Sequence, residues 1–465
     1  MIFQPHYLAC LSQASYLVAD EASKVAVVVD PRRDVGVYLA AARALGVEIR
    51  HVVLTHFHAD FVSGHLELAA ATGATIHVGA RGRTDYPSLA ARDGGDLVLG
   101  PRVRLRFLET PGHTPESICA LVFDRLASEC VPQAVLTGDT LFLGDVGRPD
   151  LMASVGHSET ELAGWLYDSL HAKLLPLPDA TVVHPGHGAG SLCGKALSAD
   201  MCSPLGVQRR TNYALAPMSK AEFVRLVTAD QPAAPAYFGY DADLNRRVRP
   251  TLGAVTSLPE LSLDETLARA RAGAVLLDVR PAAEFGGGHL AGSVNVGLEG
   301  RFAQWAGSSI DPRAPVVLVT PAGRADEAAL RLARVGFDRV VGRLCDLEAA
   351  LRARPDLVRR IAKTSAVDLV RREAAGTAPV VIDVRAASEW TAGHVEGSLN
   401  LPLTGLLARL RDVPRDREVL VHCQSGYRSS LATSLLAREG FTNVTDLVGG
   451  WAAYDAARAP AFPEL

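Results

Sequence analysis

The chain has 465 residues, and its 47 Lys and Arg against 51 Asp and Glu leave a formal net charge of only −4. A charge so close to balance disfavours binding to nucleic acid or to an anionic membrane, and we expect neither partner. No apolar run approaches the ~20 residues that a membrane span needs. The length predicts roughly three domains.

The seven cysteines are scattered along the chain, and no two of them form a Cys-x-x-Cys pair. Their odd number and irregular spacing indicate free thiols in a reducing compartment and no disulfide framework. Residues 1–20 lack a basic start followed by a long apolar run, so we expect no secretory signal. Together these features predict a cytoplasmic protein.

The first half of the chain, to about residue 240, alternates short apolar strands with helical stretches. Its pattern predicts a helix over 35–45, which ends at a glycine. The same pattern predicts strands over 25–30, 74–78, 103–108, 134–137 and 181–183.

A further apolar run, 51–54, is followed at once by His56, His58 and Asp60 at a spacing of two residues. Imidazole and carboxylate groups at the end of a strand are what a divalent metal needs. A lone His-x-His would be structural about as often as functional, but the added aspartate favours a metal site.

Three more loops present His or Asp at a strand end or in a Gly/Pro turn. His113 lies in Thr-Pro-Gly-His-Thr-Pro, Asp139 in Gly-Asp-Thr, and His184 in His-Pro-Gly-His-Gly. Because rigid strands can aim such loops at one point, we expect these residues to meet in a metal site.

The second half of the chain contains an internal duplication, which follows a Pro-rich stretch at 229–250 that we interpret as a linker. Each copy has an apolar strand ending in Asp-Val-Arg, then Gly-His-x-x-Gly-Ser-x-Asn, a second strand and a helix. The second strands are expected at 316–319 and 419–421. This alternation predicts two α/β domains with parallel sheets.

The two copies differ in the loop after that second strand. One copy has Cys423 in His-Cys-Gln-Ser-Gly-Tyr-Arg-Ser, and the other has no cysteine in residues 320–325, with a proline in its place. Loop amides and a helix N-terminus stabilise a thiolate and an anion bound to it, and Arg428 adds a fixed positive charge. A buried structural thiol is the alternative.

Residues 362–465 resemble a rhodanese domain throughout, including Gly-Gly-Trp at 449–451. The loop has the sulfurtransferase length, whereas tyrosine phosphatases usually have one residue more. The resemblance implies that Cys423 carries a persulfide sulfur and that Arg428 is catalytic, with a substrate cradle formed by Gln424, Ser425, Gly426 and Tyr427. Residues 257–355 resemble a rhodanese that has lost its cysteine, so we expect a structural or docking role for them.

Residues 1–245 resemble the metallo-β-lactamase superfamily, an αββα sandwich with the signature His-x-His-x-Asp-His. The sixth position here is Phe61, which cannot bind a metal. This departure disfavours a two-metal hydrolase and is compatible with the persulfide dioxygenases, which hold one iron through two histidines and one carboxylate. Carried over to this chain, the resemblance implies the ligands His56, His113 and Asp139.

Other residues receive supporting roles in this interpretation. His58, Asp60 and His184 would orient the ligands or accept protons. For Asp60 and His184 the alternative is that they only help the loops to fold. Arg148 would hold the carboxylate of a thiol carrier or an anionic product, with a surface salt bridge as the alternative. Cys202 is a candidate sulfur relay or a small hydrophobe, and His65 and His187 are expected in loop hydrogen bonds.

The order of the domains resembles a fused persulfide dioxygenase–sulfurtransferase. The resemblance implies one non-haem Fe(II) per chain, oxidation of glutathione persulfide or a similar persulfide by O₂ to sulfite and thiol, and sulfur transfer at Cys423 that exchanges sulfur between thiosulfate and a persulfide. Such an enzyme would serve sulfide detoxification, as a homo-oligomer (dimer or tetramer). Two alternatives are a zinc-dependent thioester or lactone hydrolase of the glyoxalase II type and a sulfur-relay protein that does not oxidise.

Overall fold

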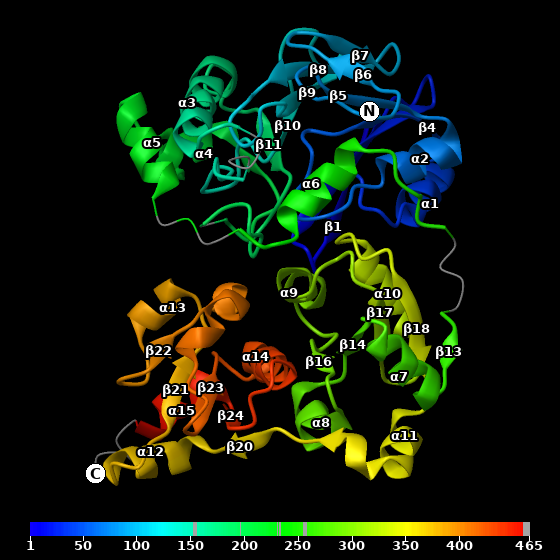
Figure 1. Ribbon diagram of the computed structural model, residues 1–465. Coiled ribbons are helices and arrows are strands. Elements are labelled where there is room, and N and C mark those ends of the chain that lie inside the picture. The colour runs from blue at the N-terminus through cyan, green and yellow to red at the C-terminus, as the bar shows by residue number, and fades with distance from the viewer. Residues whose placement is uncertain (152–155, 196, 230, 232–233, 254–257, 459–465) are drawn as a thin grey trace, which may run out of the picture. The chain divides into compact units, whose positions relative to one another are not determined.

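The computed structural model describes residues 1–151, 156–195, 197–229, 231, 234–253 and 258–458 (Figure 1). The chain divides into two compact units, Met1–Ala254 with Ala333–Gly336 and Val255–Leu332 with Phe337–Leu465. The predicted domain boundary at residue 257 and the predicted end at 465 lie outside the described residues.

The first unit contains two six-stranded sheets. One has the order β1-β2-β3-β4-β5-β6, with bounds Ile2–Leu8, Gln13–Ala19, Val25–Val29, Glu48–Val53, Thr75–Gly79 and Leu89–Ala91. The other has the order β12-β11-β10-β9-β8-β7, with bounds Ser203–Pro204, Val182–Pro185, Ala134–Gly138, Ile118–Asp124, Val103–Glu109 and Asp96–Val98. Strands β3 to β6 are parallel, as are β10 and β11.

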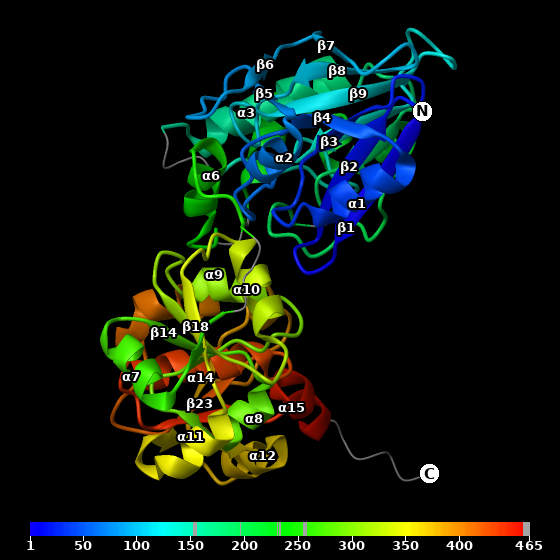
Figure 2. The ribbon, with the colours of Figure 1, turned by 90° about the vertical axis from the view of Figure 1, so that its right-hand side faces the viewer.

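Successive side chains of a strand point to opposite faces of its sheet, and here the side chains on both faces are apolar and buried. One face of each sheet therefore packs against the other sheet. Val27 and Val29 of β3 belong to one buried cluster with Leu105 of β8. The side chain of Val28 lies on the opposite face and packs with Tyr38 of α1 (Gly36–Leu45). Figure 2 shows α1 and α2 (His65–Thr72) on the near side of the first sheet.

Helices also cover the outer face of the second sheet, where Leu121 and Val135 cluster with Leu166 of α3 (Glu159–Ser169) and Phe223 of α5 (Lys220–Thr228). A five-residue π-helical turn, Leu170–Leu174, extends α3. Helix α4 (Leu205–Thr211) and a 3₁₀ turn, Tyr213–Leu215, follow β12. The first unit therefore has the predicted αββα architecture.

The predicted strands and the predicted helix at 35–45 are present to within one or two residues, but the segment 229–250 is not a linker. It contains α6 (Phe238–Arg246). In this helix the buried Asn245 donates from Nδ2 to the carbonyl oxygens of His58 and Phe61, at 2.8 Å each. The linker prediction is wrong here because prolines bound a helix that belongs to the first unit.

The second unit contains two five-stranded parallel sheets, as predicted. The first has the order β13-β18-β17-β14-β16, with bounds Glu260–Leu261, Val340–Leu344, Val316–Val319, Val275–Asp278 and Val294–Asn295. The second has the order β20-β24-β23-β21-β22, with bounds Ala362–Thr364, Val444–Leu447, Val419–His422, Val380–Asp383 and Leu399–Asn400. A short pair, β15 (His289–Leu290) and β19 (Val358–Arg359), is antiparallel.

Helices and 3₁₀ turns connect these strands. In the first repeat they are α7 (Leu263–Arg271), α8 (Ala282–Gly287), α9 (Phe302–Ser309), α10 (Ala325–Ala333), α11 (Leu347–Ala353) and the turn Pro355–Leu357. In the second they are α12 (Ala366–Ala374), α13 (Ala387–Ala392), the turn segment Leu403–Asp412, α14 (Tyr427–Arg438) and α15 (Gly450–Arg458).

The registers of the two sheets align the repeats residue by residue. Val319 pairs with Asp278 in the first sheet, and His422 pairs with Asp383 at the same place in the second. The residue that replaces the cysteine is therefore Thr320, and the proline that the sequence suggested in this place lies one residue later. Within the described ranges, no helix is both long and apolar enough to cross a bilayer.

Candidate metal centre and cysteine loop

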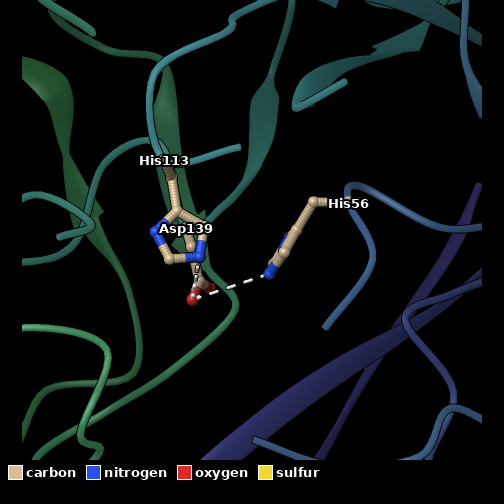
Figure 3. A group of neighbouring side chains, drawn as sticks. All are labelled: His56, His113 and Asp139. Carbon is tan, nitrogen blue, oxygen red and sulfur yellow. Dashed lines mark ion pairs between the residues drawn. The ribbon is translucent and has the colours of Figure 1, made fainter. Parts of the chain in front are cut away.

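Three of the predicted ligands meet in the first unit. His56 follows β4, His113 lies between β8 and β9, and Asp139 follows β10. All three are buried, and their ligand atoms lie within 4.8 Å of one another (Figure 3). Nε2 of His56 lies 3.8 Å from Oδ2 of Asp139, and Nε2 of His113 lies 3.5 Å from the same oxygen.

The orientation of His56 follows from a chain of hydrogen bonds. The hydroxyl of Thr55 donates to Oδ2 of Asp30 at 2.8 Å, and the same oxygen of Thr55 lies 3.0 Å from Nδ1 of His56. Because the Thr55 proton is used on the carboxylate, we assign the second bond as donation from His56 Nδ1. Burial, and then three nearby histidines, hold the pKa of His56 well below its ordinary value, so the neutral ring presents a lone pair at Nε2.

His113 is oriented by backbone. Its Nδ1 lies 2.9 Å from the carbonyl oxygen of Arg148, which accepts the ring proton and leaves Nε2 free to bind a metal. A Cβ at Gly147 would overlap the carbonyl oxygen of Asp139 and lie 2.9 Å from His113 Nδ1. Only glycine fits between the two ligands.

The donor set passes a direct test of fit to a metal. Nε2 of His56 and both carboxylate oxygens of Asp139 are buried, and no hydrogen-bond partner for them exists among the described residues. Buried polar groups are normally paired, so three unpaired atoms that converge indicate a site that fits a cation. Two imidazoles and one carboxylate suit a six-coordinate ion such as Fe(II), with three positions left open.

A second group of potential ligands adjoins the first, and it changes one prediction. It consists of His58, Asp60 and His187, all buried. Nε2 of His187 lies 3.5 Å from Asp60 Oδ2 and 3.6 Å from Asp139 Oδ1, while its Nδ1 lies 3.2 Å from the carbonyl oxygen of Ser12. His187 was expected to make only a loop hydrogen bond, but it also faces the site.

His184 was placed beside the metal by the sequence analysis, and the structure puts it elsewhere. It still belongs to β11, and its ring packs 4.6 Å from Phe3 and 5.5 Å from Tyr16. Burial lowers its pKa to about 4. His187 lies two residues beyond the strand, after Gly186, where a Cβ would come 2.6 Å from Asp139 Oδ1.

His58 pairs with an aspartate that the sequence analysis did not single out. Nε2 of His58 lies 2.9 Å from Oδ1 of Asp30. Burial alone would lower the pKa of His58, but the carboxylates of Asp30, Asp60 and Asp139 together outweigh burial and raise it. Phe61 packs on the other side, with its ring centroid 4.3 Å from that of His58, so the site has an apolar wall as predicted.

Cys193 adjoins the candidate metal site, whereas the predicted relay residue Cys202 is exposed. Cys193 is buried, with its ligand atom within 4.8 Å of those of Asp139 and His187. Burial, then the carboxylates of Asp60 and Asp139, raise the pKa of its thiol well above the ordinary value. The two cysteines are close in sequence, and only the course of the loop after His187 distinguishes them.

Arg148 is buried, so the surface salt bridge considered for it is wrong in one respect. Its guanidinium does form an ion pair, with Asp150 at 2.6 Å, and it also donates to the carbonyl oxygen of Leu192 at 3.3 Å. The backbone nitrogen of Arg148 donates to the carbonyl oxygen of Cys193 at 3.0 Å. Arg148 therefore connects His113, which bonds to its carbonyl oxygen, with the loop that carries Cys193.

The second chemical site is the loop between β23 and α14. Cys423 is buried, and its Sγ accepts a hydrogen bond from the amide of Gly426 at 3.1 Å and lies 3.7 Å from Oγ of Ser429. A Cβ at Gly450 would overlap the carbonyl oxygen of Cys423. This explains the second glycine of Gly-Gly-Trp, whose tryptophan amide donates to the same oxygen at 2.7 Å.

The cations around the loop are already paired with carboxylates. Arg428 forms a two-pronged ion pair with Glu389, at 2.6 and 2.7 Å. Arg385 pairs with Asp383 at 2.6 Å and donates to Oε1 of Gln424 at 3.3 Å. Glu389 was not predicted as the partner of Arg428, although both copies carry a glutamate at this position of the repeat, Glu284 and Glu389.

A cavity of about 470 Å³ opens beside this loop, between the two repeats. The active loop contributes Ser425, Gly426 and Tyr427 to its wall, and Pro321 and Arg324 come from the equivalent loop of the cysteine-less repeat. The structure thus brings the two loops, which the sequence places a hundred residues apart, to the same space.

Comparison with known proteins agrees with this division. A model described as "Metallo-beta-lactamase superfamily" matches residues 8–187, and a model described as "Rhodanese-like domain" matches residues 262–344 and 366–457. A crystal structure of a metallo-beta-lactamase from Staphylococcus aureus subsp. aureus COL is similar over 74% of this chain and 99% of its own, with 31% identity and a TM-score of 0.67.

Curated relatives include proteins with two different enzyme names. The hydroxyacylglutathione hydrolase of Rhodospirillum rubrum is 33% identical over 52% of this chain and 86% of its own length. A protein of the same name from Polaromonas is 35% identical over 37% of this chain and 61% of its own. The human protein named "Persulfide dioxygenase ETHE1, mitochondrial" is 29% identical over 37% of this chain and 63% of its own. The chain thus spans less than two thirds of the last two relatives.

Proposed function

This chain belongs to the metallo-beta-lactamase superfamily and carries two rhodanese-like domains, and from that premise we propose that it is a persulfide dioxygenase fused to a sulfurtransferase. The resemblance to proteins named persulfide dioxygenase supports the first activity. The presence of Cys423 in one rhodanese-like domain supports the second.

The observation that carries the first activity is the buried group His56, His113 and Asp139 with its orphaned ligand atoms. One ferrous ion, when bound there, would supply the open positions at which a persulfide sulfur and O₂ react. The protein's part is orientation. Thr55 and the carbonyl of Arg148 fix the tautomers of the two histidines, which keeps both Nε2 atoms available.

The neighbouring groups shape the space for the substrate. Phe61 excludes water from one side, and His58 is held by Asp30. Asp60 and His187 face the ligand group with carboxylate oxygens and Nε2 that lack hydrogen-bond partners within the described ranges. In this proposal they accept hydrogen bonds from the bound persulfide or from water, and the products are sulfite and the free thiol.

The sulfurtransferase step uses Cys423. Its thiolate attacks the outer sulfur of a persulfide or of thiosulfate, a new S–S bond forms, and the thiol or sulfite leaves. In the other direction, sulfite attacks the outer sulfur of the Cys423 persulfide, which yields thiosulfate and regenerates the thiolate. The Gly426 amide, which already donates to Sγ, supports the negative charge in both directions. Fusion raises the effective concentration of one product near the other site.

The test is oxygen consumption by anaerobically iron-loaded protein on addition of glutathione persulfide, with sulfite and thiosulfate measured together. We expect His113→Ala to lose oxygen uptake, and Cys423→Ser to keep uptake but release sulfite in place of thiosulfate. Metal binding without any uptake, together with normal persulfide formation at Cys423, would instead favour the sulfur-relay protein.

A zinc-dependent thioester or lactone hydrolase is the second candidate, because His58, Asp60 and His187 form a further possible metal group. The relatives named hydroxyacylglutathione hydrolase support it as well. Phe61 weighs against it, since the sixth signature position lacks a ligand. Thioester hydrolysis by zinc-loaded protein, with no oxygen uptake by iron-loaded protein, would decide for the hydrolase.

A further inference from the structure

The cysteine-less repeat contacts the helix that carries the active loop of the other repeat. Helix α14 lies beside β16 (Figure 1). The hydroxyl of Tyr427 donates to the carbonyl oxygen of Gly297 at 2.5 Å. Oγ of Ser430 donates to Oδ1 of Asn295 at 2.6 Å, and the backbone amide of Asn295 donates to Oγ of Ser434 at 3.0 Å. These bonds follow the first two turns of α14.

We propose that the cysteine-less repeat positions the sulfur-carrying loop, with Tyr427 as the positioning residue; the inference rests on the sulfurtransferase half of the proposed function. Tyr427 is the first residue of α14, directly after Gly426, whose amide donates to Cys423 Sγ. Fixing the Tyr427 side chain on Gly297 therefore fixes the peptide that supports the sulfur.

This peptide needs an external anchor because of its conformation. Gly426 has φ of +113°, in a region that glycine enters freely and from which it also leaves freely. The anchor lies outside the loop's own repeat. Tyr427 is half-buried, and burial raises the pKa of its hydroxyl, so the group stays protonated and donates to the carbonyl of Gly297.

The duplicated asparagine makes an additional contact in the first repeat. Asn400 in the second repeat donates to the carbonyl oxygens of Asp383 and Arg385, at 3.1 and 3.0 Å. Asn295 donates to the equivalent carbonyls of its own repeat, at 3.0 Å each, and in addition its Oδ1 bonds to Ser430. The first copy thus keeps the local role and adds a contact to the active helix.

The test uses one variant on each side of the contact, each with a matched control. Tyr427→Phe removes only the hydroxyl, and Tyr454→Phe is its control, since the Tyr454 hydroxyl bonds to Glu373 within the second repeat. Gly297→Ala places a Cβ 3.3 Å from the Tyr427 ring, and Gly287→Ala is its control, with no atom within 4 Å of the new Cβ.

Full-length proteins are compared in sulfur transfer from thiosulfate to cyanide, with persulfide at Cys423 measured by intact mass. We expect kcat to fall about five- to tenfold in Tyr427→Phe, the effect of one lost hydrogen bond, while KM for thiosulfate changes less than twofold. Gly297→Ala should lower kcat in the same direction, and both controls should stay within twofold of the parent.

Two results would overturn the positioning role. One is an unchanged kcat in both Tyr427→Phe and Gly297→Ala. The other is an equal loss in the Tyr454→Phe control, which would show a general effect of tyrosine hydroxyls on folding. If Tyr427→Phe does not fold, Gly297→Ala alone decides. A parent protein that forms no persulfide at Cys423 would refute the sulfurtransferase itself, and that outcome is separate from the other two.

Discussion

Replacing Thr55 by valine tests how the metal centre is assembled. The Thr55 hydroxyl is buried between Oδ2 of Asp30, at 2.8 Å, and Nδ1 of His56, at 3.0 Å. Valine keeps the shape of the side chain and removes both hydrogen bonds. Asp30 retains the Thr55 backbone amide at 2.8 Å and His58 at 2.9 Å, so the main loss falls on the His56 ring.

The magnitude follows from leaving the His56 Nδ1 proton without its acceptor. An unsatisfied buried group costs about 1–3 kcal/mol, and we expect the free energy of unfolding of the metal-free protein to fall by this amount. Loss of a partner that orients a ligating histidine lowers metal affinity about 10- to 100-fold. The ring can avoid part of the penalty by turning, which moves Nε2 away from the metal, or by changing tautomer, which places a proton on Nε2. Either change prevents Nε2 from binding the metal.

The assay is an anaerobic titration of Fe(II), with Co(II) as a spectroscopic substitute, against a competing chelator. Urea unfolding of the metal-free proteins accompanies it. Thr55→Ser keeps the hydroxyl and should bind metal nearly as the parent does. Thr228→Val is the matched control, since it removes a hydroxyl that donates to a helix carbonyl at 2.8 Å, away from the site.

The result that would refute this reasoning is specific. If Thr55→Val loses stability but binds metal as tightly as Thr55→Ser, the hydrogen bond from His56 has no part in ligation. His56 would then be a structural histidine, and the group with His113 and Asp139 would need another interpretation.

Other variants probe separate parts of the structure. In Gly186→Ala the added Cβ would lie 2.6 Å from Asp139 Oδ1, so we expect metal affinity to fall about tenfold or more in the same titration; unchanged affinity would show that this carboxylate is not at the centre. Asn245→Ala should reduce the free energy of unfolding by about 2–3 kcal/mol, because it leaves the carbonyl oxygens of His58 and Phe61 without their donor. A change below the error of urea unfolding would contradict that role. Burial raises the pKa of Asp446 from 3.8 to about 6, so its contribution to stability is complete below pH 3.8 and is lost as the pH rises through about 6. The free energy of unfolding should fall by up to about 3 kcal/mol over this range, and Asp446→Asn should abolish the fall. Plots of the free energy of unfolding against pH that run parallel for parent and variant between pH 4 and pH 8 would argue against a buried charge there.

Local pattern predicted several strands, one helix of the first unit and the overall plan of the chain, but it missed α6, which lies in the segment interpreted as a linker. The strands of residues 316–319 and 419–421 are apolar runs bounded by turn residues, and the structure contains both. The repeated Asp-Val-Arg and Gly-His motifs were enough to recognise the duplication. Such features depend on neighbours along the chain, so no knowledge of the tertiary structure was needed.

The metal site was only partly accessible in this way. The sequence pointed to His56, His113 and Asp139, which the structure brings together. The supporting role at this site was predicted for His184 and not for His187, although the two histidines are only three residues apart. What separates them is where β11 ends and which way each side chain then faces, and that depends on pairing with distant strands.

The sequence by itself determined the duplication, the alternation of strands and helices and the residues that could carry chemistry, and the resemblance of its motifs to known families implied the fold class and the order of the domains. Only the tertiary structure decided which groups meet. Cys193 lies beside the candidate metal ligands, Glu389 pairs with Arg428, and the carbonyl of Gly297 accepts a hydrogen bond from Tyr427. The physical reason is that hydrophobic periodicity is a local property. Pairings across tens or hundreds of residues are set by sheet register and by the packing of whole elements.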